Sequence, residues 1–75
     1  MKNSGQKPAK PSIVEVRDII RGYFPRASVA WVRPVRWVQY PTGVEGYLGT
    51  VKVTLADGRS TLKSVGNDGF GTWIR

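Results

Sequence analysis

The stretch TVKVTLADGRSTLK, residues 50–63, decides the fold that this 75-residue sequence predicts. Valine, threonine and leucine dominate on both sides of Asp57-Gly58, which is strand composition around a turn dipeptide. Asp-Gly readily takes the two positive φ values of a type I′ turn, so we expect a two-residue hairpin with Ala56 opposite Arg59. Two adjacent antiparallel strands therefore form the centre of the predicted structure.

The predicted hairpin also indicates which side chains share a face, because side chains alternate along a strand. Counting back from the turn places Lys52 opposite Lys63, with Arg59 on the same face. Like charges opposite each other destabilise a strand pair by about 0.2–1 kcal/mol. Either both amines splay into water, or they form an anion-contacting face with Arg59. The predicted core side holds Val51, Val53, Leu55 and Leu62, and the predicted outer side adds the hydroxyls of Thr50, Thr54 and Thr61.

Further strands are expected on both sides of this hairpin. After it, a third strand over residues 59–65 leads to the turn Asn67-Asp68-Gly69 and a short closing strand, FGTWIR. Before it, residues 28–40 form a first long strand and PTGVEG, residues 41–46, a loop.

The first strand contains WVRPVRW, residues 31–37, with two tryptophans and two arginines around one proline. Strict alternation mixes large apolar groups with cations on both faces. Pro34 has no N–H, so it belongs on an edge strand or at a bulge, and a bulge there shifts the alternation by one residue. The expected exposed face then holds Trp31, Arg33, Arg36, Val38 and Tyr40, and the expected core face holds Ala30, Val32, Val35 and Trp37.

Two interpretations of that exposed face remain open. Trp31 and Tyr40 can stack on bases, at about 1–3 kcal/mol per base, while the arginines bind phosphates. Alternatively, both tryptophans of the stretch belong to the core, and Arg33 and Arg36 guard an exposed strand edge against aggregation. Trp73 is expected to pack under the helix.

An amphipathic helix is expected ahead of the strands, over residues 12–23. Ser12 and Glu15 have the spacing of a capping box, and apolar residues such as Val16 and Ile20 recur at helical intervals. Phe24 precedes Pro25, which disfavours helical geometry and ends the helix. The predicted fold is therefore α+β, one N-terminal amphipathic helix packed on a three- to four-stranded antiparallel sheet. Residues 1–11 are expected to form a flexible basic arm, and residues 12–75 a single small domain.

The composition argues against an enzyme. The chain has no cysteine and no histidine, which removes the usual zinc sites and a histidine base. Of five carboxylates, only Glu45 has no structural explanation, and a lone carboxylate is a poor acid–base site. We expect no catalytic residue, no metal and no cofactor. No apolar run approaches the roughly 18 residues of a membrane span, so we expect a cytoplasmic protein without a membrane partner.

Charge indicates the partner. Twelve lysines and arginines face five acidic residues, a net charge of +7, which attracts anions. The sequence predicts a non-enzymatic protein that binds nucleic acid, DNA or RNA, or a nucleoprotein complex, through a basic, aromatic-containing sheet face. The alternative is a phage- or mobile-element-encoded inhibitor or adaptor of the anti-CRISPR kind, which binds a protein partner. The first strand also offers an edge for a homodimer. The candidate binding residues are Trp31, Arg33, Arg36, Tyr40, Lys52, Arg59 and Lys63.

Overall fold

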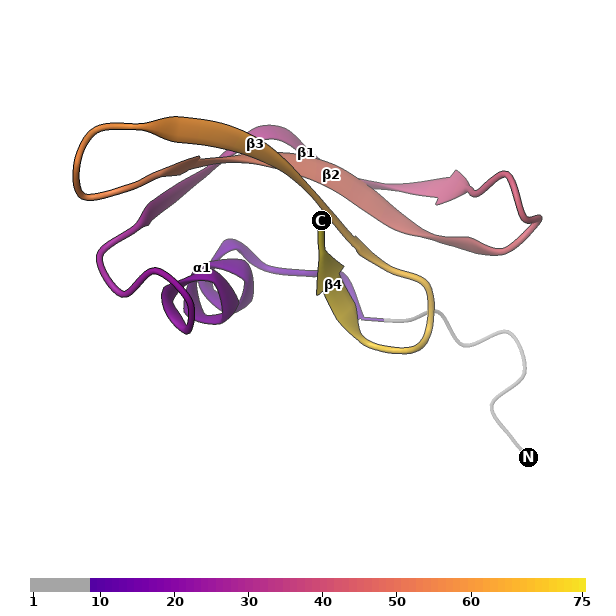
Figure 1. Cartoon of the computed structure of the whole chain (residues 1–75). Coiled ribbons are helices and arrows are strands. Elements are labelled where there is room, and N and C mark those ends of the chain that lie inside the picture. The colour runs from indigo at the N-terminus through magenta and orange to yellow at the C-terminus, as the bar shows by residue number, and fades with distance from the viewer. Residues whose placement is uncertain (1–8) are drawn as a thin grey trace.

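The computed structural model describes residues 9–75, which form one helix and one four-stranded antiparallel sheet (Figure 1). The strands lie in chain order, β1-β2-β3-β4, each pairing with the next. This arrangement confirms the predicted α+β fold, including the short closing strand. The elements are α1 (Ile13–Arg21), β1 (Ser28–Gln39), β2 (Glu45–Thr54), β3 (Ser60–Asn67) and β4 (Thr72–Ile74). No helix within residues 9–75 is long and apolar enough to cross a membrane.

Helix α1 begins at the predicted cap. The hydroxyl of Ser12 accepts a hydrogen bond from the backbone N–H of Glu15 at 3.1 Å, which satisfies one of the N–H groups that a helix start leaves unpaired. At the other end, Arg21 Nε donates to the carbonyl of Ala27 at 3.0 Å. This bond ties the last turn of α1 to the start of β1, so the helix is held against the sheet at the end where the chain reverses.

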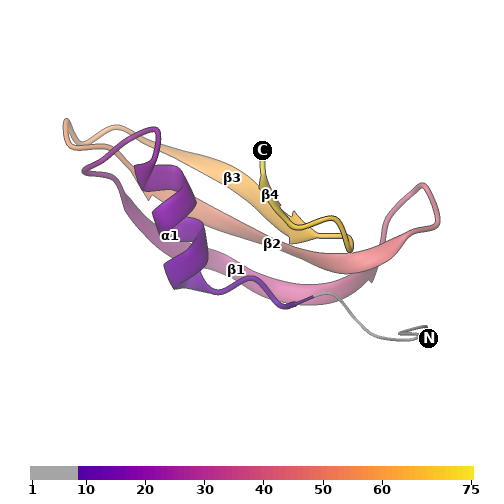
Figure 2. The same cartoon turned by 90° about the horizontal axis from the view of Figure 1, so that it is seen from below.

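The helix covers one face of the sheet, and the other face carries no element of the described chain (Figures 1 and 2). We call these the helix side and the outer face. Residues of the helix side and of α1 enclose the core, which is small and built largely of valine. The core cluster contains Val16, Ile20, Ala27, Val51, Val53 and Val65, with Ile13, Val29, Trp31, Leu55 and Ile74 packed around it.

The turn between β2 and β3 differs from the predicted one. Gly58 N–H donates to the carbonyl of Leu55 at 2.9 Å, and Leu55 N–H donates to the carbonyl of Arg59 at 2.7 Å. The loop therefore has three residues rather than two. Gly58 has a φ of 91°, as expected for a type I turn followed by a glycine bulge.

This extra loop residue shifts the register by one and moves every β3 side chain to the opposite face from the predicted one. Lys52 lies opposite Leu62, and Lys63 lies opposite Val51. The predicted lysine pair was therefore wrong. Lys63 is on the helix side, while Leu62, predicted in the core, is 60% exposed on the outer face. The assignment of the β2 side chains to their faces is confirmed.

Strand β1 carries two register shifts against β2, one between Trp31 and Arg33 and one between Arg33 and Arg36. Trp31 is opposite Val51 and packs against the core cluster, so its predicted place on the exposed face was wrong. Val32, predicted in the core, is 49% exposed. The single bulge predicted at Pro34 accounts for only the second shift.

Ala30, also predicted on the core face, is exposed and lies opposite Lys52 on the outer face, so that expectation was wrong too. The places expected for Arg33, Arg36 and Val35 are confirmed. Arg33 and Arg36 pair with Thr50 and Leu48 on the outer face, and Val35 is buried. The ring of Trp37 makes an edge-to-face contact with Tyr47, with centroids 5.1 Å apart.

The N-terminal segment joins the folded body earlier than predicted. Pro11 is buried, and the carbonyl of Ala9 accepts a hydrogen bond from Asn67 Nδ2 at 3.1 Å. Asn67 is itself buried, and its Oδ1 accepts from Gly69 N–H at 2.9 Å. This side chain therefore joins the first described residues to the β3–β4 turn. The remainder of the predicted basic arm, residues 1–8, lies outside the described residues.

Candidate functional site

The outer face is the side of the sheet that the helix leaves uncovered in the described part of the chain (Figures 1 and 2). Paired residues on neighbouring strands share a face, so the side chains form rows across the sheet. The central row runs from Arg33 through Thr50 to Ser64. The flanking rows contain Ala30, Lys52 and Leu62 on one side, and Arg36, Leu48 and Gly66 on the other. Ser28, Thr54 and Ser60 complete the face toward the β2–β3 turn.

Three cations of β1 and β2 share this face, and none of the five acidic side chains lies in their rows. Arg75, which exchanges two backbone hydrogen bonds with Ser64, adds a further guanidinium at the β4 end of the central row. Arg33, Arg36 and Lys52 are all exposed. All five acidic residues of the chain lie elsewhere: two are in the helix, two are in turns, and Glu45 pairs with Gln39 at the start of β2. The ion pairs in residues 9–75 involve only Arg17 with Asp18 and Arg59 with Asp57. The outer face is therefore positive and uncompensated by nearby carboxylates.

Arg59 and Lys63, the other predicted cations, lie apart from these three. Arg59 is in the β2–β3 loop, where its Nε lies 2.7 Å from a carboxylate oxygen of Asp57. Both partners are exposed, so the pair stabilises the turn only weakly, but Arg59 already has an anionic partner. Lys63 is partly buried on the helix side, because the register places it opposite Val51.

The predicted aromatic residues are not surface platforms beside the arginines. Trp31 packs on the core. Tyr40 follows β1, and its hydroxyl donates to the carbonyl of Tyr47. Its ring lies beside Trp73, with centroids 6.4 Å apart, and the guanidinium of Arg75 lies 5.0 Å from the Trp73 ring centroid. Trp73 pairs with Gly66, and Ile74 takes the place under the helix that was predicted for Trp73.

Sequence reasoning missed Leu62 and Ser64 as neighbours of the outer-face cations. Leu62 is the partner of Lys52, and Ser64 is the partner of Thr50. Both were assigned to the wrong face, because the predicted loop between β2 and β3 was one residue too short. The signal that reveals them is the glycine at the third loop position, Gly58, which is typical of three-residue hairpin loops.

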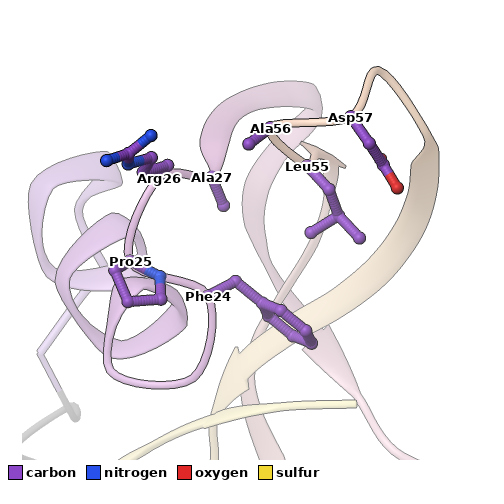
Figure 3. Close-up of a pocket in the computed structure, with 7 residues that line it drawn as sticks. All are labelled: Phe24, Pro25, Arg26, Ala27, Leu55, Ala56 and Asp57. Carbon is purple, nitrogen blue, oxygen red and sulfur yellow. The ribbon is translucent and has the colours of Figure 1, made fainter.

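A separate apolar pocket of about 390 Å³ lies between the α1–β1 connection and the β2–β3 loop (Figure 3). The ring of Phe24, 48% exposed, and the side chain of Leu55 form its walls, while the guanidinium of Arg26 points away from it. Pro25, Ala27 and Ala56 complete its apolar lining. Asp57 and Arg26 are the titratable residues of this lining, and the remaining residues are apolar, so the pocket suits an apolar group rather than an anion.

Comparisons of the chain with protein-family models, with curated proteins and with solved structures gave no match. Within residues 9–75, no three acidic, histidine or cysteine side chains lie close enough together to hold a metal ion.

Tyr40 gives a pH-dependent prediction. Burial, with a smaller contribution from the Asp68 carboxylate, raises the pKa of the Tyr40 phenol above its usual value of about 10. The unfolded chain then loses this proton first as the pH rises, so folding stability falls once the pH passes about 10. We expect the free energy of unfolding, measured with a chemical denaturant at several pH values above about 10, to fall less steeply with pH for Tyr40→Phe than for the wild type. Parallel curves would show that the phenol keeps its ordinary pKa.

Proposed function

We propose that this protein binds nucleic acid without catalysing a reaction, and that the outer face of the sheet is the binding surface. The observation that carries the proposal is the row arrangement of the outer face, which gathers Arg33, Arg36 and Lys52 and excludes all five carboxylates. A positive surface without internal ion pairs draws polyanions at long range. Nucleic acid, with one phosphate per nucleotide, is the polyanion whose charges repeat along an extended backbone.

The neutral side chains of the face support the same partner. Thr50 and Ser64 lie in the row between the cations, and hydroxyls are common phosphate ligands. Leu62, 60% exposed beside Lys52, offers an apolar contact to a sugar or base. The aromatic side chain that the pairing adds to this face is Trp73, which lies over Gly66 at the β4 edge and is only partly exposed. The described residues around the arginines therefore offer no stacking platform of the kind found in many single-strand binding proteins. We therefore expect binding dominated by phosphate contacts and tolerant of sequence.

A fluorescence-anisotropy titration tests this function. Labelled single- and double-stranded oligonucleotides are titrated with the wild type and with Arg33→Ala/Arg36→Ala/Lys52→Ala at two salt concentrations. We expect wild-type affinity to fall as salt rises. We expect the triple variant to bind at least about tenfold more weakly and with a flatter salt dependence, because each lost phosphate contact removes roughly 0.9 from the slope of log K against log salt.

A second triple variant provides the control for net charge. Lys10, Arg26 and Lys63 lie off the outer face, and replacing all three by alanine lowers the net charge by the same amount. We expect this variant to retain most of the wild-type affinity. Equal losses in the two triples would mean that total charge, and not the outer face, attracts the nucleic acid.

Single substitutions of Lys52 and Lys63 compare the two faces of the sheet most directly. Lys52 and Lys63 occupy neighbouring positions of the β2–β3 pair but lie on opposite faces. Lys52→Ala should weaken binding and Lys63→Ala should not. If the wild type binds neither oligonucleotide even at low salt, the nucleic-acid proposal fails, and the protein is then the inhibitor or adaptor of a protein partner, with the apolar pocket at Phe24 as its first candidate contact.

A further inference from the structure

The two register shifts of β1 produce a groove on the outer face. Its volume is about 350 Å³, and it is lined by residues of β1 and β2 at the two register shifts. Both outer-face arginines lie on it, together with polar and apolar neighbours. The lining residues are Val32, Arg33, Pro34, Arg36, Leu48, Gly49 and Thr50.

Backbone packing holds the groove in place. Gly49 is buried under β1, and a Cβ added there would lie 2.8 Å from the carbonyl oxygen of Arg33 and 2.8 Å from the backbone nitrogen of Val35. The β1 backbone therefore closes directly on Gly49 at the second shift. Val35, 6% exposed, anchors the same segment in the interior. The groove is a fixed feature of the paired strands and not of a loop.

The second shift gives the two arginines a common direction. Arg33 and Arg36 are three residues apart, so a regular strand would place them on opposite faces. The extra residue between them puts both on the outer face, opposite Thr50 and Leu48 respectively. Bulges are a known device for aiming a side chain at a binding site. Within residues 9–75, neither guanidinium has an ion pair.

The chemistry of this groove suits a phosphate group. Two guanidinium groups offer planar, paired N–H donors that match phosphate oxygens in bidentate geometry, and the hydroxyl of Thr50 adds a third donor group. Val32 and Leu48 contribute apolar side chains to the lining of the groove, and a less polar surrounding strengthens charge-assisted hydrogen bonds.

We propose that this groove holds one phosphodiester group of the bound nucleic acid, clamped between Arg33 and Arg36. The inference rests on the proposed function and specifies it. The clamp positions the nucleic-acid backbone on the sheet, whereas Lys52, one row away, contributes a diffuse charge.

Replacing both arginines by lysine tests the clamp, because Arg33→Lys/Arg36→Lys keeps the net charge and removes the paired donors. We expect oligonucleotide affinity in the anisotropy titration to fall about tenfold, as for the loss of bidentate contacts to a charged group. The matched control is Arg26→Lys, which makes the same charge-conserving exchange in the α1–β1 connection, off the outer face, and should change affinity little. Circular dichroism should show all three proteins equally folded, since these side chains are exposed.

This experiment distinguishes failure of the proposed function from failure of the arginine clamp alone. A wild type that shows no salt-sensitive binding overturns the proposed function and the clamp together. A wild type that binds, with Arg33→Lys/Arg36→Lys binding equally well, overturns the clamp alone and leaves the outer face as a surface of undirected positive charge. A selective loss in the lysine variant supports the clamp.

Discussion

Gly66→Ala should destabilise the protein by about 3 kcal/mol or more, at the upper end of the range for overpacked sites. A Cβ at this position would lie 2.6 Å from the carbonyl oxygen of Tyr47 and 2.7 Å from Cε2 of Trp73. The first of these atoms belongs to the paired strand β2, so it cannot move away without breaking the β2–β3 ladder. A chain of this length has a total stability of roughly 4–11 kcal/mol, and urea unfolding should show a large share of it lost.

Two variants identify the cause of this effect. Gly22→Ala replaces a glycine of helical φ, −64°, and should stay within about 1 kcal/mol of the wild type. Combining Gly66→Ala with Trp73→Ala should cost less than the sum of the two single changes, because residues in contact are not additive. A Gly66→Ala protein as stable as the wild type would show that neither Trp73 nor the Tyr47 carbonyl lies against Gly66.

Val16→Ala should cost about 2–3 kcal/mol. Val16 is fully buried in the cluster that joins α1 to the sheet, and removing two buried carbons loses about 0.8 kcal/mol each in transfer free energy, with a further penalty for the cavity left behind. Few large side chains surround it, because the core of this small domain consists largely of valines. Thermal unfolding followed by circular dichroism measures the change.

Val14 provides a matched comparison in the same helix. It is two residues away and 51% exposed, so Val14→Ala should change stability by less than about 0.5 kcal/mol, as for most surface substitutions. Similar losses for the two variants would mean that α1 does not present Val16 to the sheet, and the assignment of the helix side would be wrong.

The helix and the order of strands were predictable because their signals are local. Ser12 and Glu15 mark the helix start, and the apolar spacing from Ile13 to Ile20 marks its buried side. Gly43 and Gly58 each follow two other residues in hairpin loops of the same length, with φ values of 90° and 91°. In the sequence, a lone glycine that follows two other loop residues is the signal of a three-residue loop, because the third position of such a loop requires a positive φ. The prediction of a two-residue turn at Asp57-Gly58 instead assigned every β3 side chain to the wrong face of the sheet.

The bulges of β1 were only partly predictable. Pro34 in the sequence indicates the second register shift, between Arg33 and Arg36. No residue of the surrounding sequence indicates the first shift, between Trp31 and Arg33. That shift follows from tertiary packing: Trp31 is drawn onto the core, which is short of large side chains, and Arg33 must then turn outward. Of the five candidate cations, only Arg33, Arg36 and Lys52 lie on the outer face and are free of ion pairs in the described part of the chain.

The predicted homodimer through the first strand remains a prediction. Strand β1 is at the edge of the sheet, as such a dimer requires. However, its two register shifts and Pro34 interrupt the edge in the middle, and these features oppose the addition of another strand. Oligomer formation by this route would have to use the regular segments before or after them.

Methyl NMR during a titration with an oligonucleotide tests most directly whether the outer face binds nucleic acid. The methyl groups of Val32, Leu48 and Leu62 report on the outer face, and those of Val16 and Val65 report on the buried helix side. We predict that signals of the first group shift progressively with added oligonucleotide while those of the second stay in place. Shifts confined to the Leu55 and Ala27 methyls at the apolar pocket, or an absence of shifts on the outer face at low salt, would contradict the proposal.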